Sequence, residues 1–278
     1  MKLGVSSYSF KKYMAASGCD YIKICDLAKE FGFAGIEFTP LENVDDPMVA
    51  AREIKEHCDK IGLEIIAYTV GANLIGDKAD DCVLELFRYI DVAEALGAKT
   101  LRHDVCYSLP KGLYTYREAI EEMVPRIRRV TEYAASKGIR TCTENHGFIF
   151  QAPERVRELI HAVGNDNYGW LCDMGNFLCA DAEPAASVAI AAPYTFHVHA
   201  KDFLFKDGSE LCPNGFFTTA GGNFIRGTVV GHGIVPVRKC VNILKRAGYN
   251  GWLSLEFEGY EDCLYAIKAG LEYLKACV

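Results

Sequence analysis

The sequence predicts an α/β protein with a single domain, a closed barrel of eight parallel strands known as the (β/α)8 or TIM barrel. Two patterns lead to this prediction. Amphipathic helical stretches repeatedly end in a glycine that directly precedes a short β-rich run, and glycine is favoured just past a helix C-terminus. Strands that alternate with helices pair in parallel through right-handed crossovers, and eight such units close a barrel.

Eight predicted strands recur along the 278 residues. Five of them follow a glycine: residues 33–39 after Gly32, 63–70 after Gly62, 98–105 after Gly97, 139–145 after Gly138, and 252–257 shortly after Gly248. Residues 3–9, 168–174 and 194–200 complete the set.

The segments between the strands carry apolar residues three and four positions apart, which is the spacing of one helix face. The clearest sets are Leu27/Phe31, Ile54/Cys58/Ile61, Val83/Leu86/Ile90/Ala93, Ile120/Met123/Ile127/Val130 and Leu264/Ile267/Leu271/Leu274. We expect these faces to cover the sheet.

An open doubly wound sheet would show the same alternation, usually with fewer strands. No GxGxxG or GxxxxGK[ST] motif follows the first strand, so a nucleotide-binding fold loses its main support. No linker rich in Pro, Gly or Ser divides the chain, which predicts one domain over residues 1–278.

The longest irregular stretch, residues 203–233, contains seven glycines. Long loops in compact domains are usually functional or disordered, and we expect this one to be a lid.

The composition excludes several classes of function. A net charge of −7 disfavours binding to nucleic acid, which is itself a polyanion. The N-terminus lacks the apolar region of a secretory signal, and no apolar run approaches the roughly 20 residues of a membrane span. The twelve cysteines are scattered without a CxxC pair, which favours reduced thiols over a disulfide scaffold. We therefore expect a cytoplasmic protein without nucleic-acid or membrane partners.

Four successive strands carry a potential metal ligand near their C-terminal ends, where the loops of a barrel converge. These ligands are Glu144, Asp173, His199 and Glu256. Three carboxylates and one imidazole form a hard site with room for two substrate oxygens around a six-coordinate ion. Any one of these residues could instead pair with a neighbouring Lys or Arg, but four in register favour a metal. We expect one divalent ion, Mn²⁺, with Mg²⁺, Co²⁺ or Zn²⁺ as alternatives.

Other residues near the strand ends are candidates for substrate contact. His146 could act as a general base or donate a hydrogen bond to substrate, or be a simple surface residue. Lys201 could meet a phosphate or carboxylate, or pair with Asp173 or Asp202. The ring of Tyr8 could line the pocket and pack against the apolar face of a sugar ring, or it could belong to a layer of the barrel core.

Three further polar residues lie on predicted strands. Arg102 and His103 are near the end of the fourth strand, and His197 precedes His199 on the seventh. Arg102 could hold a substrate oxygen, although an ion pair with Glu144 is slightly favoured. His103 is a second candidate for substrate binding. His197 shares its facing with His199, so we expect it to pack beneath the metal without ligating it.

Several short segments, taken in their order and spacing, resemble the xylose-isomerase-like TIM barrel superfamily over nearly the whole chain. They are Glu144-Asn145-His146-Gly147, Asp173-Met174-Gly175-Asn176, His199-Ala200-Lys201-Asp202, Gly231-His232-Gly233-Ile234-Val235, and Gly248-Tyr249-Asn250-Gly251 before Leu255-Glu256. The superfamily includes sugar phosphate isomerases and epimerases, ketose 3-epimerases, inosose dehydratase, C-glycoside deglycosidase subunits and endonuclease IV.

The resemblance implies roles for matching residues. In ketose 3-epimerases the counterparts of Glu144, Asp173, His199 and Glu256 bind the metal, and the two glutamates move protons. Asn176 stands where those enzymes place a substrate-binding His, so it is a further candidate for substrate binding. Their Arg after the HxH run has no counterpart. Lys201-Asp202 looks more like the inosose dehydratase and generic isomerase/epimerase branches. Endonuclease IV relatives need further metal ligands and a basic face, which this acidic chain lacks.

The leading hypothesis is therefore a sugar isomerase or epimerase that removes a proton next to a carbonyl through an enediolate, with Glu144, Glu256 and His146 as candidate catalytic residues. The alternative is a lyase that performs β-elimination on a keto-inositol or 3-keto-glycoside. A non-catalytic sugar-binding barrel is a third hypothesis, and two carboxylates poised to move protons argue against it. We expect a small sugar or polyol as partner, and either a homo-oligomer or, for a lyase, a small partner subunit.

Overall fold

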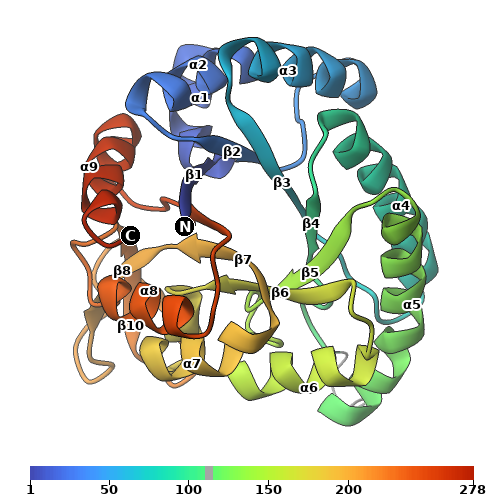
Figure 1. Cartoon of the computed structure of the whole chain (residues 1–278). Coiled ribbons are helices and arrows are strands. Elements are labelled where there is room, and N and C mark those ends of the chain that lie inside the picture. The colour runs from blue at the N-terminus through green and yellow to red at the C-terminus, as the bar shows by residue number, and fades with distance from the viewer. Residues whose placement is uncertain (110–114) are drawn as a thin grey trace.

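The computed structural model, which describes residues 1–109 and 115–278, confirms the predicted (β/α)8 barrel (Figure 1). All neighbouring barrel strands pair in parallel, and the sheet closes in the order β1-β11-β7-β6-β5-β4-β3-β2. The strands are β1 (Lys2–Ser6), β2 (Gly35–Phe38), β3 (Glu64–Val70), β4 (Thr100–His103), β5 (Arg140–Glu144), β6 (Tyr168–Asp173), β7 (Thr195–Ala200) and β11 (Trp252–Leu255).

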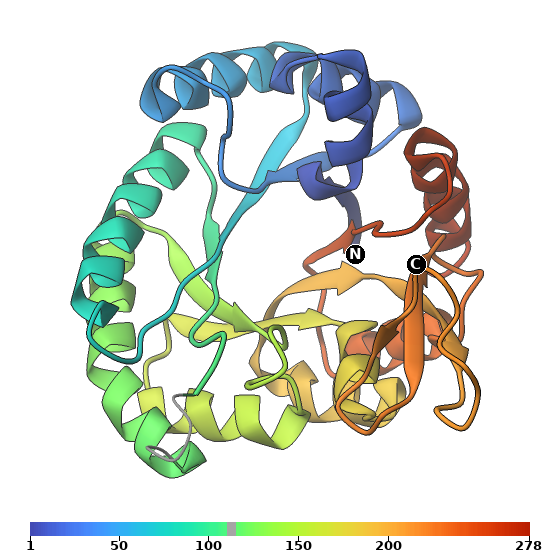
Figure 2. The ribbon, with the colours of Figure 1, turned by 180° about the vertical axis from the view of Figure 1, so that it is seen from behind.

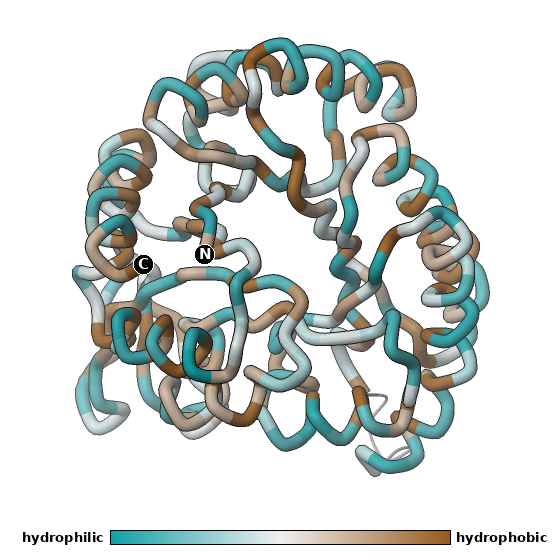
Figure 3. Tube along the Cα trace, in the orientation of Figure 1, coloured by the Kyte–Doolittle hydropathy of each residue, from teal (hydrophilic) through white to brown (hydrophobic). Residues whose placement is uncertain are grey.

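A ring of helices surrounds the strands in both views (Figure 1 and Figure 2). They are α2 (Tyr21–Phe31), α3 (Pro47–Ile61), α4 (Ala79–Leu96), α5 (Tyr116–Ser136), α6 (Pro153–Val163), α7 (Pro184–Ala191), α8 (Val237–Arg246) and α9 (Cys263–Lys275). Apolar and polar residues alternate along them (Figure 3). Most members of the predicted apolar faces are buried, as Val83, Leu86 and Ile90 of α4 illustrate, and Phe31, Ile61 and Leu264 are half-buried.

Short helices occupy some of the connections. The 3-10 helix η1 (Ser7–Phe10) and the helix α1 (Lys11–Ser17) lie between β1 and α2, so they extend the first loop at the C-terminal end of the barrel. Two more 3-10 helices are η2 (Asn176–Ala180), after β6, and η3 (Ala192–Tyr194), before β7. The loop that carries η1 and α1 therefore lies at the end of the barrel where its functional residues are expected.

The glycines that guided the strand prediction adopt the expected backbone conformation. Gly32, Gly62 and Gly97 follow helices with φ values of 98°, 66° and 76°. A side chain is strained at such angles, whereas glycine reaches them without a steric cost. Each of these helices therefore stops where the next strand must begin.

The prediction of an irregular loop at residues 203–233 is wrong. Three antiparallel strands form there, β8 (Asp202–Lys206), β9 (Phe217–Thr218) and β10 (Phe224–Thr228), in the order β8-β10-β9 (orange in Figure 2). Phe203 and Ile225 bury their side chains against Cys179, and Asp181 accepts hydrogen bonds from Thr219 and Asn223. The sheet is thus tied to the connection that follows β6.

All twelve cysteines are free thiols, and most are buried. Across the two described segments of the chain, we find no helix that combines the length and the apolar character needed to cross a membrane. Glu37 and His197 are buried polar residues inside the barrel, and they belong to the site described next.

Candidate metal centre

The structure brings the four predicted ligands together at the C-terminal end of the barrel. Glu144, Asp173 and His199 lie at or near the ends of β5, β6 and β7, and Glu256 directly follows β11. One ligand atom from each residue lies within 4.8 Å of the others. His199 Nδ1 is 3.7 Å from Glu144 Oε1, 3.8 Å from Asp173 Oδ2 and 3.5 Å from Glu256 Oε2.

Two atoms of this cluster indicate that it suits a cation. His199 Nδ1 and Asp173 Oδ2 are buried without a hydrogen-bond partner, although buried polar atoms almost always have one. Burial, together with the Glu144 and Glu256 carboxylates, raises the pKa of Asp173 to about 7 against the opposing effect of Lys201. A divalent ion would satisfy both atoms and the excess negative charge, and this hard donor set suits Mn²⁺, Mg²⁺, Co²⁺ or Zn²⁺.

Glu37 of β2 supports His199 from below. His199 Nε2 lies 2.7 Å from Glu37 Oε1, and His197 Nε2 lies 2.5 Å from Glu37 Oε2. A carboxylate at the outer nitrogen of a ligating histidine holds the proton there and leaves the other nitrogen free for the metal. His197 therefore packs beneath the site, as expected. Sequence reasoning missed Glu37, whose signal is a lone acid within the apolar run Gly35-Ile36-Glu37-Phe38.

Glu144 is held on both of its oxygens. Arg102 donates to Oε2 from Nε at 2.7 Å and also from Nη2, which is the ion pair favoured in the sequence analysis. The side chain of Asn176 donates to Oε1 at 2.8 Å. Burial opposes ionisation of Glu144, but Arg102 and His199 outweigh it and hold the pKa of this carboxyl well below its usual value. Asn176 thus contacts a ligand and is itself buried.

Lys201 links Glu256 to the outer residues of the site. Its Nζ lies 2.7 Å from Glu256 Oε2, 3.6 Å from Asp173 Oδ2 and 3.4 Å from Glu258 Oε2. Burial opposes ionisation of Glu256, but Lys201 and then His199 lower its pKa to about 2. The main contacts of Lys201 are therefore ion pairs with the carboxylates of the site.

A cavity of about 210 Å³ opens beside these ligands. The lining residues include Tyr8, Lys11, Thr39, Thr69, Arg102, Glu144, His146, Lys201, Glu256 and Glu258. Three predicted contact residues, Tyr8, His146 and Lys201, thus line the same cavity as the two ligands Glu144 and Glu256. No residue from 203–233 lines the cavity, so this arrangement does not support the predicted lid.

His146 is paired with Asp104, which the sequence analysis missed. His146 Nδ1 lies 3.0 Å from Asp104 Oδ1, and Asp104 is buried. Burial opposes protonation of His146, but the Asp104 carboxylate raises its pKa. The position of Asp104 could have been predicted from the segment Arg102-His103-Asp104. Alternate residues of an extended chain point to the same side, so Asp104 shares its side with Arg102. In the structure Arg102 and Asp104 lie on the same side, with Arg102 Nη1 at 3.4 Å from Asp104 Oδ2.

The assignment of His103 to substrate binding needs correction. His103 is fully buried on the other side of β4, where its ring lies 5.9 Å from that of Tyr168. Its Nδ1 contacts the Asp104 carbonyl oxygen at 2.8 Å. Burial lowers the pKa of His103 to about 4. This residue belongs to the packing between strand and helices.

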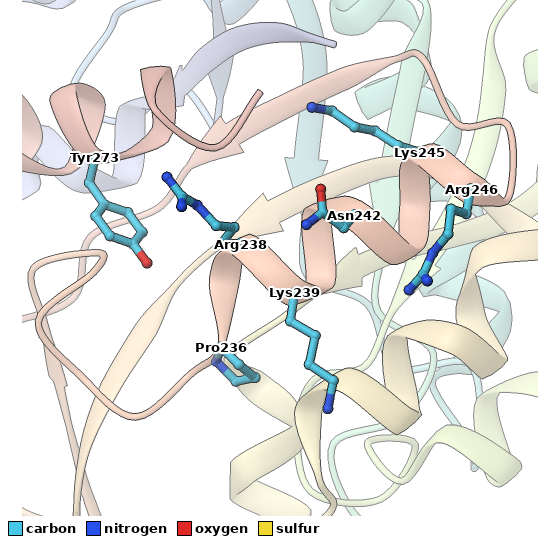
Figure 4. Close-up of a pocket in the computed structure, with 7 residues that line it drawn as sticks. All are labelled: Pro236, Arg238, Lys239, Asn242, Lys245, Arg246 and Tyr273. Atoms are coloured by element: carbon cyan, nitrogen blue, oxygen red, sulfur yellow. The ribbon is translucent and has the colours of Figure 1, made fainter.

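A larger cavity of about 680 Å³ lies along α8, away from the ligands (Figure 4). It is lined by Pro236, Arg238, Lys239, Asn242, Lys245, Arg246 and Tyr273. Arg238 and Lys245 donate to the backbone carbonyls of Ala276 and Cys277. The four basic side chains point in different directions in Figure 4 and do not converge on one point. Size alone therefore does not identify the site.

Comparison with known proteins gives several relatives of similar length. The inosose dehydratase of Glaesserella parasuis serovar 5 is 23% identical over 221 residues, which cover 74% of this chain and 73% of that protein. The inosose dehydratase of Histophilus somni is 22% identical over 244 residues, 80% of each chain. These identities are low, but the matches extend over most of both sequences.

Solved structures show the same fold. The probable 3-DHS dehydratase AsbF of Bacillus anthracis has a TM-score of 0.76, 20% identity and 99% coverage of both chains. The IolI protein with a bound zinc atom has a TM-score of 0.77, 15% identity, and coverage of 100% and 98%. D-psicose 3-epimerase from Clostridium cellulolyticum H10 has a TM-score of 0.75, 16% identity, and coverage of 100% and 99%.

A family model matches residues 25–277, which is nearly the whole chain. The match agrees with the closed parallel barrel and with the resemblance carried by the segments around the ligands. The protein therefore belongs to the xylose isomerase-like TIM barrel family.

Proposed function

We propose that the protein is a metal-dependent lyase that performs β-elimination on a keto-polyol ring such as a keto-inositol. The observation that carries this proposal is His146 in the wall of the cavity, with its Nδ1 held by the buried Asp104 carboxylate. It supplies an acid/base group that is not one of the four candidate ligands. Because Asp104 engages Nδ1 of His146, Nε2 is free to exchange a proton with substrate.

The contacts of Glu144 give less support to the isomerase or epimerase hypothesis. That hypothesis needs Glu144 and Glu256 as two bases on opposite faces of an enediolate. Glu144 is almost fully buried, and its oxygens are engaged by Arg102 and Asn176 in addition to facing the cluster. Little capacity is left for proton transfer, whereas His146 has 42% of its side chain exposed.

The reaction can be written with the residues at hand. A bound divalent ion would stabilise the negative charge that develops on the substrate carbonyl oxygen. His146 Nε2 takes the proton from the carbon next to the carbonyl, and the C–H electrons form a carbon–carbon double bond as an enolate. The enolate electrons then expel the hydroxyl from the following carbon. The protonated His146 returns its proton to this hydroxyl, which leaves as water, and the organic product is an enone.

The comparisons are in keeping with this choice, because the similar curated proteins carry the name inosose dehydratase. We further propose Mn²⁺ as the resident ion, since three carboxylates and one imidazole form a hard donor set. The zinc atom in the similar IolI structure makes Zn²⁺ the main rival. Metal analysis of protein purified without added metal, followed by reloading with each ion, tests this choice.

The test of function is a panel of keto-inositols, keto-sugars and 3-keto-glycosides incubated with Mn²⁺-loaded protein in D₂O. We expect a product that has lost water and absorbs as an enone. An isomer of unchanged composition that carries solvent deuterium would instead establish an isomerase or epimerase. His146→Gln should slow elimination by about 10²-fold or more, the scale of general acid/base catalysis. Replacement of the exposed His161 by Gln is the matched control and should have no effect.

A further inference from the structure

We infer that Glu258 is a specificity residue whose carboxylate accepts a hydrogen bond from one ring hydroxyl of the substrate, so that a ring lacking this hydroxyl binds poorly. This inference rests on the proposed function, because it concerns the cavity beside the candidate metal ligands. Glu258 lines that cavity together with Glu144 and Glu256. Among the described residues that line it, Glu258 is the one acid outside the cluster of candidate ligands.

The side chain of Glu258 is accessible, whereas the ligands are covered. It is 47% exposed, and the side chains of Glu144 and Glu256 are 1% and 10% exposed. Glu258 can therefore meet a molecule in the cavity without any movement of the ligands.

The carboxylate of Glu258 retains the capacity to accept further hydrogen bonds. Its Oε1 accepts from the Tyr8 hydroxyl at 3.1 Å, and its Oε2 accepts from Lys201 Nζ at 3.4 Å. These are its two side-chain hydrogen bonds within residues 1–109 and 115–278, and a carboxylate offers about four acceptor positions. The two donors orient the carboxylate and leave about half of its acceptor positions for a substrate.

Lys201 places Glu258 beside the ligands. Its Nζ lies 2.7 Å from Glu256 Oε2 and 3.4 Å from Glu258 Oε2, so a single ammonium group separates a ligand from Glu258. A polyol ring that meets the ion through its carbonyl oxygen carries hydroxyls around the rest of the ring. In a cavity of about 210 Å³ the ring stays close to the walls, and one of these hydroxyls can reach Glu258.

The backbone around Glu258 is held from two sides. On one side it packs against β10, because a Cβ added at Gly227 would lie only 1.7 Å from the Glu258 carbonyl oxygen. On the other side Lys12 of α1 donates from Nζ to the Gly259 carbonyl oxygen. Such support fixes a binding group before the substrate arrives, which lowers the cost of binding. The sheet of β8, β9 and β10 does not line the cavity, but it thus supports a residue that does.

The charges of the cavity indicate a hydroxyl as the group that Glu258 recognises. A carboxylate accepts hydrogen bonds and donates none, so its partner must be a donor. Glu258 would repel a phosphate or carboxylate placed against it, and a cationic group would meet the ammonium groups of Lys11 and Lys201. A neutral hydroxyl meets neither repulsion.

The test measures binding to the Mn²⁺-loaded full chain by calorimetry. The probes are myo-inositol and its monodeoxy analogues, each of which lacks one hydroxyl. The wild type should bind one analogue about tenfold or more weakly than myo-inositol, because the acceptor is then left without its donor. Glu258→Ala should bind the two compounds within about twofold of each other, and Glu258→Gln, which keeps an uncharged acceptor, should lie between.

The control is Glu272→Ala. Glu272 is an exposed acid of α9 that pairs with Lys275 at 2.7 Å, and it does not line the cavity. This variant should discriminate between the two compounds as the wild type does. Metal content should equal that of the wild type in all variants.

The inference and the proposed lyase fail separately. Rejection of one analogue that disappears in Glu258→Ala supports the inference even when no compound loses water in D₂O. Equal binding of all analogues by the wild type, or a rejection that survives Glu258→Ala, overturns the inference and leaves the lyase untouched. Loss of the ion in Glu258→Ala also overturns it, because Glu258 would then be a support of the ligands.

Discussion

The two sides of the barrel mouth are built from different chemistry. On the charged side, which consists of Arg102, Asp104, Glu144, Asp173, His199, Lys201 and Glu256, nearly every side chain is buried and contacts an ion of opposite sign. On the hydroxyl side, which consists of Ser7, Tyr8, Thr39 and Thr69, the side chains are neutral and border open space. The difference suggests that the charged side performs the reaction and the hydroxyl side decides which molecule enters.

Burial explains why the charged side tolerates little change. A buried charge that loses its partner costs about 3–5 kcal/mol, whereas a hydroxyl at the edge of a cavity can be replaced by water. Glu144 depends on Arg102, and Glu256 depends on Lys201. The predictions below therefore set a change on the charged side against a control outside it.

The largest effect is expected at the ligands. His199→Ala and Asp173→Ala should each reduce metal content from about one ion per chain to near zero, because each removes one of the four ligand atoms. Activity should be abolished in both variants, as it should be by EDTA. Thr69→Val on the hydroxyl side should retain the full metal content. The measurement is elemental analysis of folded protein, with folding checked by circular dichroism. Full occupancy in either ligand variant would contradict the assignment.

Asp104→Asn should lower kcat by on the order of 10²-fold with metal content unchanged, because the amide no longer stabilises a protonated His146. The measurement is the rate at which deuterium from D₂O enters the substrate. Asp80→Asn provides the control, since Asp80 is an exposed acid whose partners are Arg126 and Arg129. A variant with normal proton exchange would remove His146 from the mechanism and return attention to Glu256.

Glu37→Gln should weaken metal binding by about 10–100-fold, the usual cost of losing a group that orients a ligand. The carboxylate places one charged oxygen beside each histidine, at 2.5 Å from His197 Nε2 and 2.7 Å from His199 Nε2, whereas the neutral amide offers an oxygen to only one of them. Competition with a metal chelator measures the affinity, and the ¹⁵N shifts of His199 report its tautomer. Glu64→Gln, which alters an exposed pair with Lys2, should change neither. Unchanged affinity would reduce Glu37 to a packing residue.

The sequence predicted the barrel and the ligand cluster because both follow from local patterns. Helix periodicity and terminal glycines locate the strands, and the topology then makes neighbours of Glu144, Asp173, His199 and Glu256. Glu37 could not be found in this way, because its contact with His197 crosses the barrel between residues 160 positions apart. The spacing of residues within one segment of the sequence cannot predict the contact between Glu37 and His197.

The two other errors also have physical causes. The sheet of β8, β9 and β10 was predicted as a loop because its strands are short and separated by glycines, so no alternation of period two is long enough to detect. His103 was assigned to the pocket because it ends a strand. Alternation along the chain places it on the opposite side from Arg102 and Asp104, whose side chains lie 3.4 Å apart.

The smallest effect on the site is expected at His103, where His103→Gln should leave metal content and turnover at pH 7 nearly unchanged. Its contribution is to stability in acid. Burial lowers its pKa to about 4 in the folded protein, whereas an unfolded histidine titrates near 6.5. The unfolded state therefore binds the proton first as pH falls, so the stabilisation is complete above about pH 6.5 and is lost toward pH 4, by on the order of 3 kcal/mol. Urea unfolding at successive pH values should show a shallower decline for His103→Gln than for the wild type, and an unchanged decline for His161→Gln at the exposed control. Identical curves for His103→Gln and wild type would show that His103 is not held neutral, and loss of turnover at pH 7 would return it to the pocket.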